Sequence, residues 1–166
     1  MENLDATTAH IKLLKKKKKE NLIQLMAIRK KSMKIILHHS LTKDSETVSW
    51  GAIRRYHKDM GWQDIGYHYG IELLRDDYEI LIGRMTDETG AHTKGYNKDS
   101  IGICFIGNFD LIVPPKEAWR LGLKLVRFLC KTYNINKTDI YGHRDFNSDK
   151  TCPGSLFDVD KFKKDL

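Results

Sequence analysis

The stretch "SIGICFIGNF", residues 100–109, is apolar almost without interruption and decides the fold. A strand that is buried on both faces has such a continuous run, whereas a strand with one solvated face alternates apolar and polar residues. We therefore expect a central strand here. A second run, "MKIILHH" at residues 33–39, contains two β-branched isoleucines and predicts another buried strand.

Further strands and helices alternate along the chain. The segments "IGYHYGIELL" (65–74) and "YEILIGRM" (78–85) predict a hairpin across "RDD", and "TDIYGH" (138–143) predicts a short strand. Helices are expected over residues 47–61, 114–134 and 156–166. The alternation predicts an α/β protein with a single central mixed β-sheet flanked by α-helices.

Two of the expected helices have a visible apolar face. In the first, Ile53, Tyr56 and Met60 recur at helical spacing, and Gly61 ends the helix. The longest begins with proline, and its apolar residues fall on one side: Leu121, Leu125, Val126 and Leu129. Each face should pack against the sheet.

Positive charge is concentrated at one end of the chain. The net charge is +7, but residues 1–32 hold nine Lys or Arg against three acidic residues, which gives +6 and leaves +1 for the rest. We therefore divide the chain into a basic N-terminal extension, residues 1–32, and a compact domain, residues 33–166.

The extension has the pattern of a basic amphipathic helix. A block of five lysines, residues 15–19, separates apolar residues at helical spacing: Ile11, Leu14, Leu22, Leu25 and Met26. Three interpretations are open: a solvated arm, adhesion to anionic lipid headgroups or wall polymers, and nucleic-acid binding. The last is disfavoured, because the extension lacks interleaved aromatic residues and the body adds almost no positive field.

Other classes are excluded by composition. The sequence has no apolar run of about 18 residues, so we expect no transmembrane segment. It has no secretory signal peptide either, so we expect synthesis in the cytoplasm. Three cysteines do not form a disulfide framework. Cys104 and Cys130 lie in apolar runs and should pack in the core, whereas Cys152 lies in the polar loop "GHRDFNSDKTCPG".

Polar residues that could form a site lie at strand ends and in loops, where α/β sheets bind ligands. They are His38, His39, Tyr67, His68, His92, His143, Lys150 and Cys152. A catalytic zinc ion takes three protein ligands and keeps a fourth position open. His143, Cys152 and one of the first two histidines could supply them. Adjacent strand residues face opposite ways, so the residues alone leave His38 and His39 as alternatives.

Four motifs occur in an order that resembles a known family. "ILHHSLT", "GWQDIGYHYGI", "GAHTKGYNKDSIGICFIGNF" and "GHRD…KTCPG" are similar to the successive motifs of the zinc-dependent N-acetylmuramoyl-L-alanine amidases of type 2. That family includes phage endolysins and animal peptidoglycan-recognition proteins. The resemblance runs from about residue 34 to residue 162 and leaves the extension outside.

The resemblance implies a role for each site residue. It makes His38, His143 and Cys152 the zinc ligands and leaves His39 on the other face. Lys150 would direct its ammonium at the oxyanion that develops during amide hydrolysis. Tyr67 would orient water or donate to the oxyanion; otherwise it is an ordinary strand tyrosine, and Lys150 an ordinary loop lysine.

Three further residues carry weaker expectations. His68 should be structural, because it follows Tyr67 directly and so faces the other way. His92 could line a substrate groove. Asp145 could orient a ligand histidine, or "HRD" could fold back as a turn.

The function that the resemblance implies is zinc-dependent hydrolysis of the amide between N-acetylmuramic acid and L-alanine in peptidoglycan. The protein would then be an endolysin that acts on the bacterial cell wall after release, with the extension aiding adhesion to the anionic envelope. The alternative is a recognition module that binds peptidoglycan without cutting it. The retained Cys152, Lys150 and Tyr67 favour the enzyme.

Overall fold

The structure is a computed structural model that describes residues 16–17, 33–42 and 49–166. The chain divides into two compact units, Met1–Ser32 and Met33–Leu166, and each is considered by itself. In the first unit only Lys16 and Lys17 are described, and both are helical and exposed. The apolar residues of the expected amphipathic helix lie outside the described residues.

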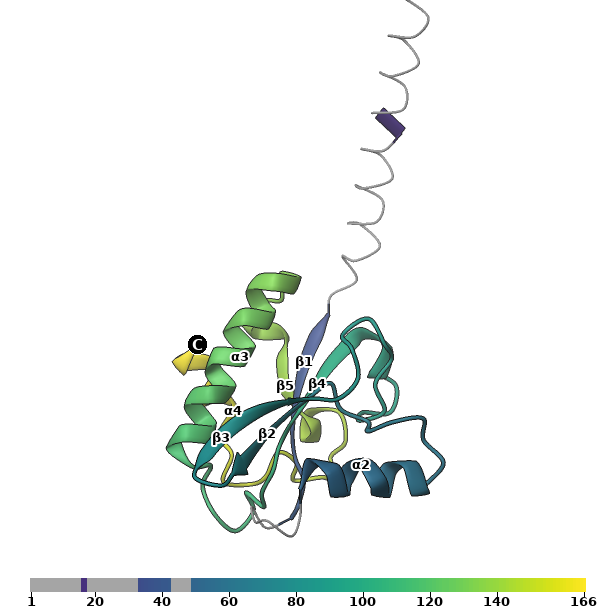
Figure 1. The fold of residues 1–166 in the computed structure, drawn as a ribbon. Coiled ribbons are helices and arrows are strands. Elements are labelled where there is room, and N and C mark those ends of the chain that lie inside the picture. Colours follow the sequence, from purple (N-terminus) through teal and green to yellow (C-terminus); the bar gives the residue numbers. More distant parts are fainter. Residues whose placement is uncertain (1–15, 18–32, 43–48) are drawn as a thin grey trace, which may run out of the picture. The chain divides into compact units, whose positions relative to one another are not determined.

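The second unit is built on a five-stranded sheet with the strand order β3-β2-β4-β1-β5 (Figure 1). The strands are β1 (Lys34–His39), β2 (Tyr69–Leu74), β3 (Asp77–Ile82), β4 (Ser100–Phe105) and β5 (Ile140–Gly142). β4 pairs in parallel with β1 and β2, and β1 pairs in parallel with β5. Only the hairpin β2-β3 is antiparallel. The predicted mixed sheet is confirmed, with β4 at its centre.

Two helices, α3 (Lys116–Tyr133) and α4 (Val159–Asp165), pack on one face of the sheet. Ile103 and Phe105 of β4 point to this face, where they share a core with Leu123, Val126 and Leu129 of α3. Around Phe105 the core is aromatic: the ring centroid of Phe157 lies 5.1 Å away. This apolar layer fixes the sheet whose carboxyl edge carries the polar residues.

The opposite face is covered by α2 (Trp50–Asp59), which packs with Cys104 and Ile106 (Figure 1). The expected apolar face of this helix is only partly right. Ile53 packs against this cluster, but Tyr56 and Met60 are 62% and 44% exposed, and the buried residues of the helix are Trp50 and His57. Tertiary contacts decide the matter, because Gly70 of β2 leaves room for the Trp50 ring: a Cβ there would approach that ring to 2.6 Å.

Several elements are shorter than their sequence patterns predict. β2 begins at Tyr69, so Tyr67 and His68 precede the strand instead of opening it. β5 ends at Gly142, and residues 143–145 form a 3-10 turn. Helix α2 ends at Asp59, and Gly61 follows with a φ of +85°, a backbone conformation that suits glycine. None of the described helices is both long enough and apolar enough to span a bilayer.

Candidate metal centre

The three predicted ligands meet where β1 and β5 end. These strands are parallel neighbours, so their carboxyl ends lie at the same edge of the sheet. His38 is the next-to-last residue of β1, His143 follows β5, and Cys152 lies in the loop beyond. One ligand atom from each lies within 4.8 Å of the others. We name His38, His143 and Cys152 the donor cluster.

The donor cluster fits a zinc ion. The Nδ1 atom of His38 and the Sγ atom of Cys152 are 3.6 Å apart. Tetrahedral zinc, with a nitrogen at about 2.1 Å and a sulfur at about 2.3 Å, requires about 3.6 Å between those two ligands. The ring centroids of His38 and His143 are 4.7 Å apart. Two imidazoles and one thiol are also a donor set that zinc prefers, and three ligands leave a fourth position for a reactant.

The structure separates His38 from His39. The His39 ring turns to the other side of β1, where its Nδ1 accepts a hydrogen bond from the Phe109 N–H at 3.2 Å. Its backbone N–H, however, donates to Cys152 Sγ at 3.4 Å, so His39 supports the donor cluster through its main chain. The His39 Nε2 atom is buried without a hydrogen-bond partner among the described residues, and nothing in the structure explains this.

The loop that carries Cys152 is held by Arg144. The Arg144 backbone N–H donates to the Cys152 carbonyl at 2.8 Å. Its guanidinium donates to the carbonyls of Gly154 at 2.7 Å and Phe157 at 3.0 Å. It also donates to the Thr151 carbonyl at 3.2 Å. Hydrogen bonds from a charged group are stronger than neutral ones, so this one side chain holds the loop on both sides of Cys152.

Asp110 ties the same loop to the segment that follows β4. One carboxylate oxygen accepts from the Thr151 hydroxyl at 2.8 Å, and the other accepts from the Ser155 N–H at 2.7 Å. The Ser155 and Thr151 bonds lower the pKa of Asp110, so the carboxylate stays ionised. The loop therefore keeps its position through two independent anchors.

The electrostatics of the donor cluster favour neutral imidazoles. Burial, followed by the neighbouring histidines, lowers the pKa of His38 well below its usual value. Burial and then the Lys150 charge lower the pKa of His143. Both rings therefore keep a lone pair for a metal at neutral pH. Burial raises the pKa of Cys152 to about 12, so a metal must displace the thiol proton when it binds.

Tyr67 lies beside the donor cluster, with its ring centroid 5.2 Å from that of His38. Burial and the thiols of Cys104 and Cys152 raise the pKa of Tyr67 well above 10. The phenol is therefore protonated at neutral pH and can act as a hydrogen-bond donor, not as a base.

Lys150 is an exposed residue of the turn before Cys152, where its N–H donates to the Asn147 carbonyl at 3.1 Å. Burial and then the Lys150 charge lower the pKa of His143. Burial raises the pKa of Cys152, and the Lys150 charge opposes part of that rise. The Lys150 ammonium therefore acts electrostatically on two members of the donor cluster.

The sequence suggested that His92 could line a substrate groove, but the structure buries this residue. Its ring is buried, with 9% of the residue exposed, and its Nδ1 lies 3.1 Å from Nε2 of His38. On the other side its Nε2 lies 3.5 Å from the Ser100 hydroxyl. Burial, followed by the charges that His68 and His143 can carry, lowers the pKa of His92 to about 3. Sequence reasoning missed this contact, because the two histidines are 54 positions apart.

Asp145 and His68 have structural roles. Asp145 accepts a hydrogen bond from the Gly142 N–H at 2.9 Å, so "HRD" folds back as a turn. His68 is buried, its Nδ1 accepts from the Gly102 N–H at 3.0 Å, and its Nε2 lies 3.1 Å from the Glu88 carbonyl. Cys104 is buried as expected, in the cluster beneath α2, and Cys130 is half-buried against the core on the α3 face.

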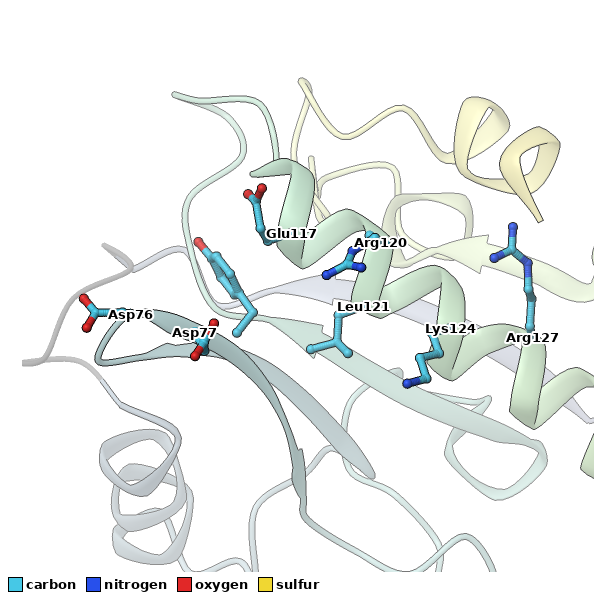
Figure 2. A pocket seen from close by; sticks show the side chains of 8 residues that line it. Asp76, Asp77, Glu117, Arg120, Leu121, Lys124 and Arg127 are labelled. Atoms are coloured by element: carbon cyan, nitrogen blue, oxygen red, sulfur yellow. The ribbon is translucent and has the colours of Figure 1, made fainter.

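A cavity of about 480 Å³ lies elsewhere, between the β2-β3 turn and α3 (Figure 2). We name it the charged cavity; its charged lining residues are Asp76, Asp77, Glu117, Arg120, Lys124 and Arg127. None of them belongs to the donor cluster, and no lining residue is a histidine or cysteine. This cavity is thus not where the chemistry-bearing residues gather.

Comparison with known proteins shows that the chain belongs to a class of enzymes, those that hydrolyse amide bonds of peptidoglycan. The model of one family, described as N-acetylmuramoyl-L-alanine amidase, matches residues 29–155, and the chain belongs to that family. The match covers the whole donor cluster and starts at the last residues of the basic extension.

Relatives of known name agree. The endolysin of Klebsiella phage KP32 is 32% identical over 137 residues, which cover 81% of this chain and 87% of the relative. The solved N-acetylmuramoyl-L-alanine amidase LysC of Clostridium intestinale superposes with a TM-score of 0.71 at 32% identity, covering 81% of this chain and 84% of that one. Drosophila PGRP-LB gives a TM-score of 0.65 at 32% identity and covers 76% and 77%. The chain is therefore an amidase similar to phage endolysins.

Proposed function

We propose that this amidase is a cell-wall lytic enzyme that depends on zinc and cuts between N-acetylmuramic acid and L-alanine. The observation that supports it most is the donor cluster, whose three ligand atoms lie within 4.8 Å. The ligands would be His38, His143 and Cys152. When bound there, zinc would supply a Lewis acid that polarises a carbonyl group and lowers the pKa of water.

The neighbours of the donor cluster prepare it for a cation. His38 and His143 are neutral at pH 7, since burial lowers the pKa of both. The N–H of His39, at 3.4 Å from Cys152 Sγ, stabilises the thiolate form of that ligand. Arg144 and Asp110 hold the loop from which Cys152 projects, so little reorganisation is needed on binding.

Lys150 and Tyr67 would stabilise the charge that forms on the carbonyl oxygen of the substrate. Lys150 brings a cation that acts on the donor cluster, and a preorganised donor of this kind contributes roughly 3–4 kcal/mol to lowering the barrier. Tyr67, whose raised pKa keeps it protonated, would donate its hydroxyl proton or orient the attacking water.

The alternative function is binding of peptidoglycan without hydrolysis, and one animal relative has been solved with a bound ligand. Drosophila PGRP-LB with a Y78F change has been solved in complex with tracheal cytotoxin. Zymography on purified cell walls, with and without a zinc chelator, separates the two functions. An enzyme that uses the donor cluster clears the wall, loses clearing with chelator and regains it with added zinc. A binding module gives no clearing in any lane, and clearing that persists in chelator would rule out the zinc site.

The basic extension would aid adhesion to anionic lipid or wall polymers of the bacterial envelope. Its support is the +6 charge of residues 1–32, and nucleic acid is the less favoured partner. We expect synthesis in the cytoplasm and action on the wall after release, as for the endolysins to which the chain is similar.

Deletion of residues 1–32 tests this role of the extension. Residues 33–166 form a compact unit of their own, so hydrolysis of a soluble muropeptide should be unchanged. Lysis of intact cells should fall, most strongly at low salt, because salt screens exposed charges. Equal lysis by both proteins at every salt concentration would contradict adhesion.

A further inference from the structure

We propose that His92 is a positioning residue that holds His38 in one tautomer, with a bare Nδ1 facing Cys152. The inference rests on the proposed function, because it assigns the direction of the hydrogen bonds behind the zinc ligand. A neutral imidazole has one N–H and one lone pair, so the partner of one nitrogen decides what the other can bind.

The direction follows from the far end of a chain of contacts. Ser100 Oγ lies 2.7 Å from the Tyr96 carbonyl oxygen, which can only accept, so the single hydroxyl proton of Ser100 goes there. Towards His92 Nε2, at 3.5 Å, the same hydroxyl can then only accept. His92 therefore carries its proton on Nε2 and has a lone pair on Nδ1.

The lone pair of His92 sets the tautomer of His38. Because His92 Nδ1 accepts, His38 Nε2 at 3.1 Å must be the donor and must carry the proton. Its Nδ1 is then unprotonated and faces Cys152 Sγ at 3.6 Å. Thr93 is compatible with this assignment. Its Oγ1 lies 3.4 Å from His38 Nε2 and 3.1 Å from His92 Nδ1, so the hydroxyl can accept a hydrogen bond from His38 and donate one to His92.

The backbone makes room for the His92 ring. A Cβ atom at Gly102, in β4, would approach Cγ and Cδ2 of His92 to 2.6 Å. One at Gly90 would approach Cδ2 to 2.5 Å. These distances are shorter than carbon atoms tolerate, so the ring occupies space that the two glycines leave free. A ring fitted so closely cannot rotate away from His38 without disturbing the sheet.

The test measures the tautomer and the zinc affinity separately. In zinc-free protein labelled with ¹⁵N at histidine, long-range ¹H–¹⁵N spectra should show His38 protonated on Nε2. In His92→Phe, which keeps an aromatic ring but has no nitrogen to accept a hydrogen bond, a second tautomer should appear, and zinc affinity measured against a chromogenic chelator should fall about 10- to 100-fold. His92→Asn, whose side-chain oxygen can replace Nδ1 as an acceptor, should restore most of the affinity.

His57→Asn is the matched control. His57 is also a buried histidine whose Nδ1 accepts, from the Gly66 N–H at 3.1 Å, but it does not contact His38. The zinc affinity of His57→Asn should equal that of the wild type. A His38 protonated on Nδ1 in the wild type, or His92→Phe with unchanged affinity, would overturn the inference. Absence of zinc binding by the wild type would instead refute the proposed function, and the tautomer measurement would still decide the role of His92.

Discussion

The donor cluster and the charged cavity gather polar side chains in opposite ways. In the donor cluster, His38 and Cys152 are 1% and 7% exposed, and both ring nitrogens of His38 lie within hydrogen-bond distance of a partner, Cys152 Sγ or His92 Nδ1. In the charged cavity, carboxylates and cations surround about 480 Å³ of open space (Figure 2). The open cavity and the cluster of potential metal ligands therefore lie in different parts of the domain.

The difference shows what makes a polar group reactive. Buried groups feel each other strongly because little water screens them, and the pKa of every donor-cluster residue departs from its usual value. The cations of the charged cavity face solvent, where an ion pair contributes little. Substitutions in the two regions should therefore differ greatly in effect.

The largest effect is expected for Cys152→Ser. A neutral hydroxyl is a much weaker zinc ligand than a thiolate, so zinc affinity should fall by more than about 100-fold, beyond the loss typical of a supporting residue. Metal analysis and cell-wall clearing should both drop to the level of chelated wild type. Cys130→Ser, at a half-buried cysteine outside the cluster, is the control. Full zinc content in Cys152→Ser would disprove the ligand assignment.

The second prediction compares two exposed lysines, Lys150 next to the donor cluster and Lys124 in the charged cavity, each replaced by alanine. Loss of the Lys150 charge should lower kcat about 100- to 1000-fold with little change in KM, because the ammonium acts on charge that forms only in the transition state. Lys124→Ala, in the charged cavity, should leave kcat within about twofold. Steady-state kinetics on a muropeptide measures both. Similar kinetics for the two variants would remove Lys150 from the catalytic machinery.

The smallest effect concerns the Arg54–Asp64 ion pair, which lies outside both regions. Arg54 lowers the pKa of Asp64 from 3.8 to about 2. The carboxylate therefore stabilises the fold above about pH 4 and loses this contribution as the pH falls towards 2. Since the two side chains are 43% and 32% exposed, we expect only about 1 kcal/mol.

Urea unfolding of wild type and Asp64→Asn measures this contribution. The difference in unfolding free energy should be largest near pH 6 and should shrink as the pH falls below about 4. A difference that does not depend on pH would mean that the pair contributes nothing through its charge.

Continuous apolar runs were enough to predict the sheet and its central strand, because burial on both faces is a local property of the sequence. The face of α2 was not predictable in this way. Trp50 is buried because of two residues of β2. Gly70 leaves room for its ring, and the Glu72 carboxylate accepts a hydrogen bond from its backbone N–H at 3.0 Å.

The candidate site divides along the same line. Ordered motifs selected His38, His143 and Cys152, and the structure brings these three together. Strand alternation alone left His38 and His39 open, and no local pattern indicated that the His92 ring lies behind His38. Contacts across 54 positions leave no periodic trace in a single sequence.

The wide separation of the ligands along the chain has a consequence for biosynthesis. His38 and Cys152 are 114 positions apart, so a ribosome must translate nearly the entire domain before the two can meet. A nascent chain that ends short of the "KTCPG" segment would lack one of the three residues of the donor cluster. If the donor cluster is the catalytic centre, as proposed, unfinished chains would therefore have no amidase activity.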